Sequence, residues 1–356
     1  MATKRGRSRC SRGDAAKEST LQGSTKMRPY GKRSLLILVL VLIVGSPLAA
    51  QSPLTPGAQP VNLGAVGAGE GPAWSPKGDG LYFSGQGHIN RRRVDGAVEV
   101  FREKAGSNGL LFDPEGRLVV CESGARRVTR TEADGSITVL ADEYEGGRFN
   151  APNDLTIDSK GRIYFTDPRY GRRDDMELRD GDGRLVEGVY RIDAPGKVTR
   201  IITHEVDRPN GILVSPNDEF LYVADNNNNN TGGARKLWRF GLKADGTINP
   251  ASRKLIFDWE DGRGPDGLKM DTRGRLYVAG GRSKATPFES DAKFKGGIYI
   301  LSPEGKLLEF VPIPVDEVTN CAFGEADLKT LFVTAGGTLW SIAVDVPGRA
   351  SYQRAR

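Results

Sequence analysis

The chain has 356 residues, of which 38% are hydrophobic and 27% are charged, a composition typical of a globular protein and not of a disordered or collagen-like one. The formal net charge is +6, but residues 1–33 hold ten Lys or Arg and two Asp or Glu, which leaves 41 basic and 43 acidic residues in the rest of the chain. A nearly neutral main body gives no electrostatic reason to expect nucleic acid as a partner.

Residues 1–50 are predicted to be a basic leader that contains a signal peptide or a membrane anchor. A basic stretch ending at Arg33 precedes an apolar run, Leu35 to Gly45, and then small residues up to Ala50. The run is short for a membrane span, and this order is typical of a secretory signal peptide. We therefore expect cleavage after Ala50 and export to the periplasm or the exterior. Uncleaved, the leader would be the only expected membrane contact, and a start at Met27 instead of Met1 is left open.

After an expected linker at 51–61, one pattern recurs six times. A turn-forming opening leads into a short apolar strand, and successive openings lie roughly 40 to 60 residues apart, which is the period of a propeller blade and not of a helical solenoid. In chain order the openings are Glu70-Gly71-Pro72, Asn108-Gly109, Asn153-Asp154, Asn210-Gly211, Asp266-Gly267 and Asn320-Cys321. The apolar strands that follow are, in the same order, GDGLYFSG, EGRLVVCES, KGRIYFTD, DEFLYVAD, RGRLYVAG and LKTLFVTA.

The predicted fold is therefore all-β, a six-bladed β-propeller over residues 62–345 with a basic C-terminal tail at 346–356. The 46 Gly and 20 Pro are scattered along the chain, as expected for many short strands joined by tight turns. The polar segment 169–187 is predicted to be an insertion that overhangs one mouth of the channel, because loops on a rigid scaffold carry specificity. The pattern makes no prediction about oligomeric state.

Four of the openings carry side chains that suit a hard metal ion. Equivalent positions of successive blades meet around the central channel of a propeller, so Glu70, Asn153, Asn210 and Asp266 are expected to converge there. Two carboxylates and two amides form an oxygen-only set, which favours calcium over magnesium or manganese, although all three remain candidates. Asn-Gly and Asp-Gly also form turns without any further role. Four ligand-type residues at one place in the repeat favour a single metal site in the channel.

The context of these openings resembles the senescence marker protein/gluconolactonase/luciferin-regenerating-enzyme-like family. The similar segments occur in one order along residues 62–345: Glu70-Gly71-Pro72-Ala73-Trp74, Asn150-Ala151-Pro152-Asn153-Asp154-Leu155, Tyr164-Phe165-Thr166-Asp167-Pro168, Arg208-Pro209-Asn210-Gly211 and Pro265-Asp266-Gly267. The resemblance implies a propeller with one catalytic divalent cation, usually calcium, held by one Glu, two Asn and one Asp, which fall on the four residues above. It also implies a gluconolactonase-like hydrolase of cyclic carboxylic esters, with a small-molecule lactone as its partner.

Three further residues are candidates for substrate binding. Family members that act on sugar acids often carry an Arg-x-Asn motif beside the second ligand, and here Arg148-Phe149-Asn150 precedes Asn153. Either asparagine could face the metal; the context of Asn153 matches the other repeats, which leaves Arg148 and Asn150 for substrate. Asp167 could orient a water or a ligand, or it could cap the turn at Pro168.

The predicted chemistry is metal-dependent lactone hydrolysis. The cation would act as a Lewis acid on the ester carbonyl, and Asp266 would be the catalytic base that accepts a proton from the attacking water. Two alternatives share the same ligand set. One is a phosphotriester or fluorophosphate hydrolase, and the other is a non-enzymatic binding propeller in which calcium serves only stability.

Overall fold

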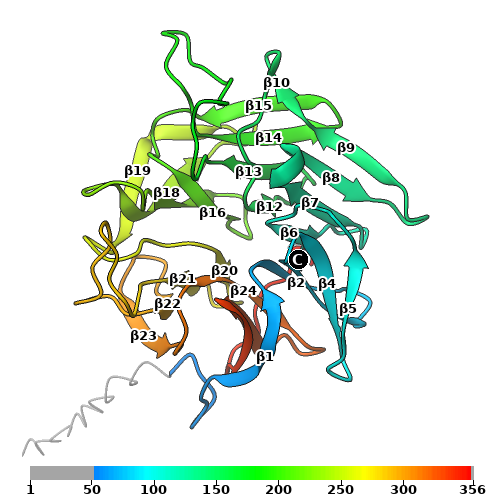
Figure 1. Cartoon of the computed structure of the whole chain (residues 1–356), viewed down its shortest axis with the longest axis vertical. Coiled ribbons are helices and arrows are strands. Elements are labelled where there is room, and N and C mark those ends of the chain that lie inside the picture. Colours follow the sequence, from blue (N-terminus) through cyan, green and yellow to red (C-terminus); the bar gives the residue numbers. More distant parts are fainter. Residues whose placement is uncertain (1–51, 354–356) are drawn as a thin grey trace, which may run out of the picture. The chain divides into compact units, whose positions relative to one another are not determined.

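The computed structural model describes residues 52–353, so the predicted leader at 1–50 lies outside the described residues. The described residues form six four-stranded antiparallel sheets and one two-stranded hairpin, β10 (Glu143–Tyr144) with β11 (Gly147–Arg148). Their single helical element is a 3₁₀ turn at Ser123–Ala125, and no helix within 52–353 is long and apolar enough to cross a membrane. The sheets follow one another around a ring in Figure 1. The predicted all-β, six-bladed propeller is therefore confirmed.

Five of the sheets are formed by four strands that are consecutive in the order of the chain. The first sheet holds β2 (Glu70–Trp74), β3 (Gly80–Gly85), β4 (His88–Arg93) and β5 (Val98–Arg102); the second holds β6 (Leu110–Phe112), β7 (Leu118–Glu122), β8 (Arg127–Thr131) and β9 (Ile137–Ala141); the third holds β12 (Leu155–Ile157), β13 (Ile163–Asp167), β14 (Gly188–Ala194) and β15 (Lys197–Ile202); the fourth holds β16 (Pro209–Val214), β17 (Phe220–Asn226), β18 (Arg235–Leu242) and β19 (Ile248–Asp258); the fifth holds β20 (Leu268–Met270), β21 (Leu276–Gly280), β22 (Gly297–Leu301) and β23 (Leu307–Pro312).

The sixth sheet closes the ring with both ends of the described chain. It holds β24 (Val318–Gly324), β25 (Thr330–Ala335) and β26 (Gly337–Ala343), and its outermost strand is β1 (Val61–Ala68), which pairs antiparallel with β26. Figure 1 shows the blue β1 beside the red strands of this sheet. Closure through hydrogen bonds between the two ends leaves no gap in the ring through which the sheets could separate.

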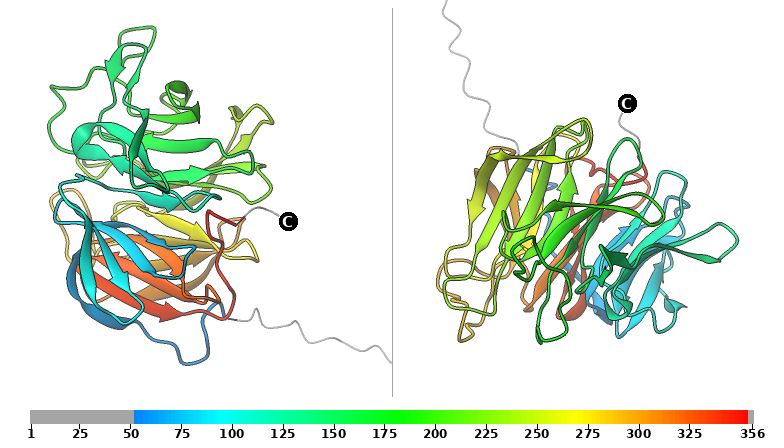
Figure 2. Two further views of the ribbon diagram at one scale, coloured as in Figure 1. Left: turned by 90° about the vertical axis from the view of Figure 1, so that its right-hand side faces the viewer. Right: turned by 90° about the horizontal axis from the view of Figure 1, so that it is seen from above.

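The core lies between neighbouring sheets, which explains why the repeat strands are so apolar. Every residue of β7 (LVVCE) and of β21 (LYVAG) is buried, whereas the outer strand β5 is largely exposed. Between the second and third sheets, the ring centroids of Phe149 and Phe165 are 5.0 Å apart and those of Phe149 and Tyr190 are 5.1 Å apart. Figure 2 shows the sheets from the side, packed face against face. A strand that is covered on both faces has no solvent-facing side, so its residues do not alternate between apolar and polar.

The six openings contact one another around the channel, since the innermost strands β2, β6, β12, β16, β20 and β24 are neighbours in that order. The Gly109 N–H donates to the Asn153 carbonyl at 2.7 Å, and the Gly267 N–H donates to the Thr319 carbonyl at 2.7 Å. Glycine is required at some of these positions: a Cβ on Gly71 would lie 2.1 Å from the Asn108 carbonyl oxygen. At these positions the opening of one blade therefore lies directly against the opening of the next.

The C-terminal segment is packed against the propeller, which corrects the prediction that a tail begins at 346. The Arg349 N–H donates to the Met270 carbonyl at 2.9 Å at the end of β20, and Ser351 Oγ donates to the Phe112 carbonyl at 2.7 Å at the end of β6. The segment thus crosses the channel at the end opposite the openings. Beside it lies a cavity of about 140 Å³ whose lining includes Trp74 and Tyr352. The packed body therefore extends to the end of the described residues.

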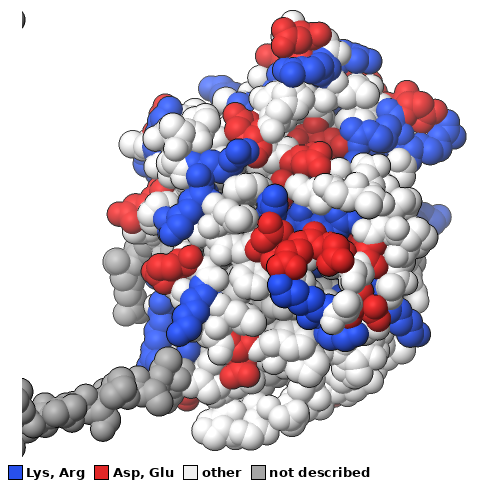
Figure 3. Space-filling view, turned by 90° about the vertical axis from the view of Figure 1, so that its left-hand side faces the viewer, with Lys and Arg blue, Asp and Glu red and all other residues white. Residues whose placement is uncertain are grey.

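The surface agrees with the near-neutral charge of the main body. On the face shown in Figure 3, acidic and basic side chains are interspersed and form no continuous basic patch. Many of these charges are paired locally, as in the contact of Lys236 with Asp258 at 3.7 Å. This face offers no continuous positive field for a polyanion.

A substitution at Gly211 tests the contact between openings. A Cβ on Gly211 would lie 2.1 Å from the Asp266 carbonyl oxygen, whereas a Cβ on Gly181 would meet nothing within 4 Å. We expect Gly211→Ala to lower the free energy of unfolding by about 1–3 kcal/mol through overpacking, and Gly181→Ala to leave it unchanged, as measured by urea denaturation. Equal stability of the two variants would contradict the close contact.

Candidate functional site

The four predicted ligands lie at the N-terminal ends of four innermost strands, on the side of the channel where the openings meet. Glu70 begins β2, Asn153 precedes β12, Asn210 lies in β16 and Asp266 precedes β20. Asn153, Asn210 and Asp266 are buried, and Glu70 is half-buried. The sheet topology thus places residues that are far apart in sequence around one channel mouth, as predicted.

Electrostatics show that three carboxyl groups interact across this mouth. Burial raises the pKa of Glu70 well above its ordinary value, and the charges of Asp266 and Asp154 raise it further. Burial also raises the pKa of Asp266 to about 6, although Arg263 acts in the opposite direction. Asp154, the second residue of its opening, was not among the predicted ligands. Carboxyl groups whose pKa is raised by burial and by neighbouring negative charge favour a nearby positive charge.

Glu70 is held on one side only. Its Oε2 accepts hydrogen bonds from the Gly71 N–H and from Asn320 Nδ2, both at 3.3 Å. The orientation of the Asn320 amide is defined because its Oδ1 accepts the Cys321 N–H at 2.9 Å. Oε1 of Glu70 accepts no hydrogen bond from any described residue, so it is available to a ligand in the channel.

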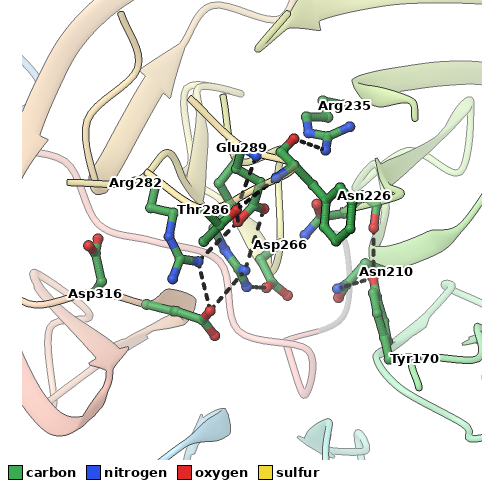
Figure 4. A network of polar contacts seen from close by, with 12 residues as sticks. Tyr170, Asn210, Asn226, Arg235, Asp266, Arg282, Thr286, Glu289 and Asp316 are labelled. Atoms are coloured by element: carbon green, nitrogen blue, oxygen red, sulfur yellow. Dashed lines mark hydrogen bonds and ion pairs between the residues drawn. The ribbon is translucent and has the colours of Figure 1, made fainter. Parts of the chain in front are cut away.

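Asp266 is held in a similar way by Arg263. Arg263 Nη2 donates to Asp266 Oδ2 at 2.8 Å, while Oδ1 is buried and has no hydrogen-bond partner among the described residues. Arg263 also lies 3.5 Å from Glu317, which in turn accepts from Arg282 Nη1 at 2.8 Å. Figure 4 shows Arg282 and Glu289 on one side of Asp266. The network fixes one carboxylate oxygen and leaves the other directed away from Arg263.

Asn210 contacts a tyrosine from the insertion between β13 and β14. Asn210 Nδ2 donates to Tyr170 Oη at 2.9 Å, and Tyr170 Oη donates to the Asn226 carbonyl at 3.1 Å. Figure 4 shows Tyr170 directed at Asn210 from the side opposite the Arg263 network. The predicted overhang of segment 169–187 is therefore confirmed at Tyr170, which no motif in the sequence marks.

The donor set fits a hard divalent cation. Oδ1 of Asp266 and Oδ2 of Asp154 are buried without a hydrogen-bond partner among the described residues, and a buried carboxylate oxygen without a partner is costly. Within 52–353 no group of three or more His, Cys, Asp or Glu side chains is close enough to hold a metal by itself. The fit therefore depends on mixed carboxylate and amide oxygens, a combination that calcium accepts.

Asn150 and Asp167 both bind backbone groups in the structure. Asp167 is fully buried, and its two oxygens accept the N–H groups of Asn150 and Ala151, each at 2.8 Å. Asn150 is 1% exposed, and its Nδ2 donates to the carbonyls of Asp167 and Val186 at 3.0 and 2.9 Å. Both oxygens of Asp167 are therefore used by the backbone that leads to Asn153, whereas Oδ1 of Asn150 is buried without a hydrogen-bond partner among the described residues. Substrate binding by these two residues stays a prediction.

The Arg148 side chain is exposed, as a residue that binds substrate would need to be. It lies in β11, where its N–H donates to Glu177 Oε2 at 2.9 Å. Its Nη2 makes only a long contact, 3.4 Å, with the Ala125 carbonyl. Within the described residues it makes no hydrogen bond or ion pair with the predicted ligands, and substrate binding by Arg148 stays a prediction.

Comparison with known proteins adds a second line of findings. The family model described as the SMP-30/Gluconolactonase/LRE-like region matches residues 68–337. A gluconolactonase from Zymomonas mobilis is 31% identical over 293 residues, 75% of either chain. A 6-deoxy-6-sulfogluconolactonase from Pseudomonas putida is 28% identical over 79% of this chain and 93% of its own length. The solved structure of a gluconolactonase from Xanthomonas campestris has a TM-score of 0.67 and 31% identity, covering 83% of this chain and 93% of that one.

Asp167 provides a test of its structural role. Asp167→Asn would place an amide against two N–H donors, so one donor would lose its partner at a cost of about 1–3 kcal/mol. We expect this loss in urea denaturation near pH 5, together with a KM for lactone that changes less than the stability does. A large rise in KM without a loss of stability would restore the predicted substrate contact.

The pH dependence of this difference follows from the pKa of Asp167, which burial raises from 3.8 to about 7. Between these values the folded protein keeps a proton that the unfolded chain has released, so the contribution of Asp167 to stability falls as the pH rises through this window. The asparagine does not titrate. The stability difference between the wild type and Asp167→Asn should therefore shrink from pH 5 to pH 8, and a difference that grows would contradict the assignment.

Proposed function

Because this chain belongs to the SMP-30/gluconolactonase/LRE-like family, we propose that it hydrolyses lactones of sugar acids with the help of one divalent cation, most favourably calcium. The named relatives support the reaction class, since those compared above are lactonases of gluconic or sulfogluconic type. The observation that carries the metal is the set of three interacting carboxylates in which Asp154 and Asp266 each keep a buried oxygen without a partner.

Glu70, Asn153, Asn210 and Asp266 are the residues that would hold the cation. Glu70, Asn210 and Asp266 each have one polar atom bound by a neighbour and an oxygen left for a ligand, and Asp154 adds negative charge beside them. When bound there, such a cation would supply Lewis-acid chemistry to an ester carbonyl. Arg148, at the exposed rim, is the proposed contact to the substrate's hydroxyl groups.

Asp266 is the proposed proton acceptor. Its Oδ2 accepts one hydrogen bond from Arg263 and keeps a second lone-pair direction for a water proton. As the water oxygen bonds to the carbonyl carbon, its proton passes to this carboxylate. When the ring C–O bond breaks, the same proton is returned to the leaving alkoxide, and the product is an open hydroxy acid. Arg263 keeps the carboxylate in place throughout.

We further propose that the protein is exported. The support is the order of a basic stretch, an apolar run and small residues before Gln51, which is typical of a signal peptide. N-terminal sequencing of the protein recovered from the periplasm or the medium would check it. A mature chain beginning near Gln51 is expected, and an intact leader on membrane-bound protein would favour the anchor.

Metal removal and return test the proposed reaction. Protein stripped with a chelator should release no acid from a panel of aldonolactones in a pH-indicator assay, and calcium, magnesium or manganese should restore the activity to different degrees. Asp266→Asn should lower kcat by at least about 100-fold, since it removes a general base as well as a ligand charge. Asp95→Asn, in an exposed turn paired with Arg93, is the control and should behave like the wild type.

Four outcomes would contradict parts of the proposal. Full activity after metal removal would exclude the cation from the reaction, and full activity of Asp266→Asn would exclude this base. Faster turnover of phosphotriesters or fluorophosphates than of any lactone would assign the other hydrolase class. Tight metal binding without turnover of either class would identify a binding propeller.

A further inference from the structure

The hydrogen bonds of Tyr170 define which way the Asn210 amide is turned. A backbone carbonyl can only accept, so the contact of 3.1 Å with the Asn226 carbonyl directs the hydroxyl hydrogen of Tyr170 toward Asn226. The Tyr170 oxygen is then left to accept at its contact of 2.9 Å with Asn210. Only Nδ2 of Asn210 can donate there, so Oδ1 is turned away from Tyr170.

We propose that Tyr170 is a positioning residue that holds the Asn210 amide with its oxygen toward the cation site. This inference rests on the proposed function, because it concerns a residue that would hold the metal. An asparagine amide can rotate by half a turn with little change in shape, and the rotated form would present an NH₂ group to a cation. Tyr170 removes that alternative for Asn210, in the way that outer hydrogen bonds orient metal ligands generally.

The place of Tyr170 is itself held from two directions. The Arg208 guanidinium lies over its ring, 5.3 Å from the centroid, and Arg208 Nε donates to Glu187 Oε2 at 2.8 Å. Glu187 Oε2 also accepts the Arg169 N–H at 2.7 Å, next to Tyr170 in the chain. Glu187 therefore links Arg208, which lies over the ring of Tyr170, to the backbone at Arg169. Removing only the hydroxyl oxygen would leave the ring and these contacts in place.

Two further residues of the site, Glu70 and Asp266, are held by a neighbour in the same way. Oδ1 of Asn320 accepts the Cys321 N–H, which turns its Nδ2 toward Glu70 Oε2. Arg263 plays the corresponding part for Asp266, by occupying Oδ2. Glu70, Asn210 and Asp266 therefore each have one polar atom bound by a neighbour and the other left for the channel. Of the three residues that hold them, Asn320, Tyr170 and Arg263, only Tyr170 comes from the insertion.

Calcium binding by variants at two positions tests the proposal. Calorimetric titration of the chelator-stripped protein with calcium chloride gives the affinity without reference to turnover. We expect Tyr170→Phe to bind calcium at least about 10-fold more weakly than the wild type, with an unchanged melting temperature of the metal-free protein. Tyr82→Phe removes a hydroxyl that contacts Asp79 at 3.3 Å in the first blade, and should bind like the wild type.

The Asn210→Asp background separates orientation from other roles of Tyr170. A carboxylate presents oxygen at both positions, so its orientation no longer matters, and the same Tyr170→Phe change should alter calcium affinity by less than about 3-fold there. In the Asn210 background, saturating calcium should also restore kcat. A 10-fold loss in both backgrounds, or a raised KM for lactone that calcium does not restore, would overturn the orienting role.

The result also distinguishes this inference from the proposed function. A wild type that binds neither calcium, magnesium nor manganese would refute both. A wild type that binds calcium and hydrolyses lactones, with a Tyr170→Phe variant of equal affinity, would refute only the role of Tyr170.

Discussion

The contact between successive strand openings is the constraint on which the site depends. At the four openings whose second residue is glycine, that residue lies against the backbone of the next blade, as Gly71 lies against Asn108 and Gly211 against Asp266. The ring of contacts is complete because β1 and β26 join the chain's two ends in one sheet. A side chain at the first position of an opening therefore has its place set by both neighbouring blades. Rigid backbone of this kind holds a ligand set more precisely than a loop does.

The arrangement concentrates negative charge where the backbone is most constrained. Glu70, Asp154 and Asp266 interact at one mouth, and burial raises the pKa of Glu70 and Asp266. Arg263 hydrogen-bonds one oxygen of Asp266 and leaves the other without a partner. The protein tolerates this electrostatic cost because the surrounding apolar sheets stabilise the fold independently of the site. The repulsion between these carboxyl groups would be relieved by the cation that we propose for this mouth.

The two ends of the channel are built differently. At the openings, polar groups converge and the insertion brings Tyr170 over the mouth. At the other end, the C-terminal segment crosses between β20 and β6 and covers the channel beside apolar residues such as Trp74. One end thus gathers the candidate site residues, and the other is closed by the C-terminal segment.

Local sequence determined the blades and the identity of the residues around the channel. Apolar strands and turn-forming openings at a regular period are properties of short segments, so the six sheets and the convergence of Glu70, Asn153, Asn210 and Asp266 could be predicted from them. Asp154 and Asn320 were present in the same openings, but nothing local shows that their side chains turn toward the site.

The tertiary structure alone decided which atoms of those residues are available. Tyr170 approaches Asn210 from an insertion and Asn320 approaches Glu70 from the other end of the chain, and long-range packing leaves no periodic signal in the sequence. Arg263 is only three residues from Asp266, but its residue type alone does not show which oxygen of Asp266 it binds. The same holds for Asp167, whose residue type suits substrate binding but whose two oxygens the backbone uses. The residue type determines which donor and acceptor atoms a side chain has. Which of those atoms remain without a partner depends on the neighbours that the fold brings to it.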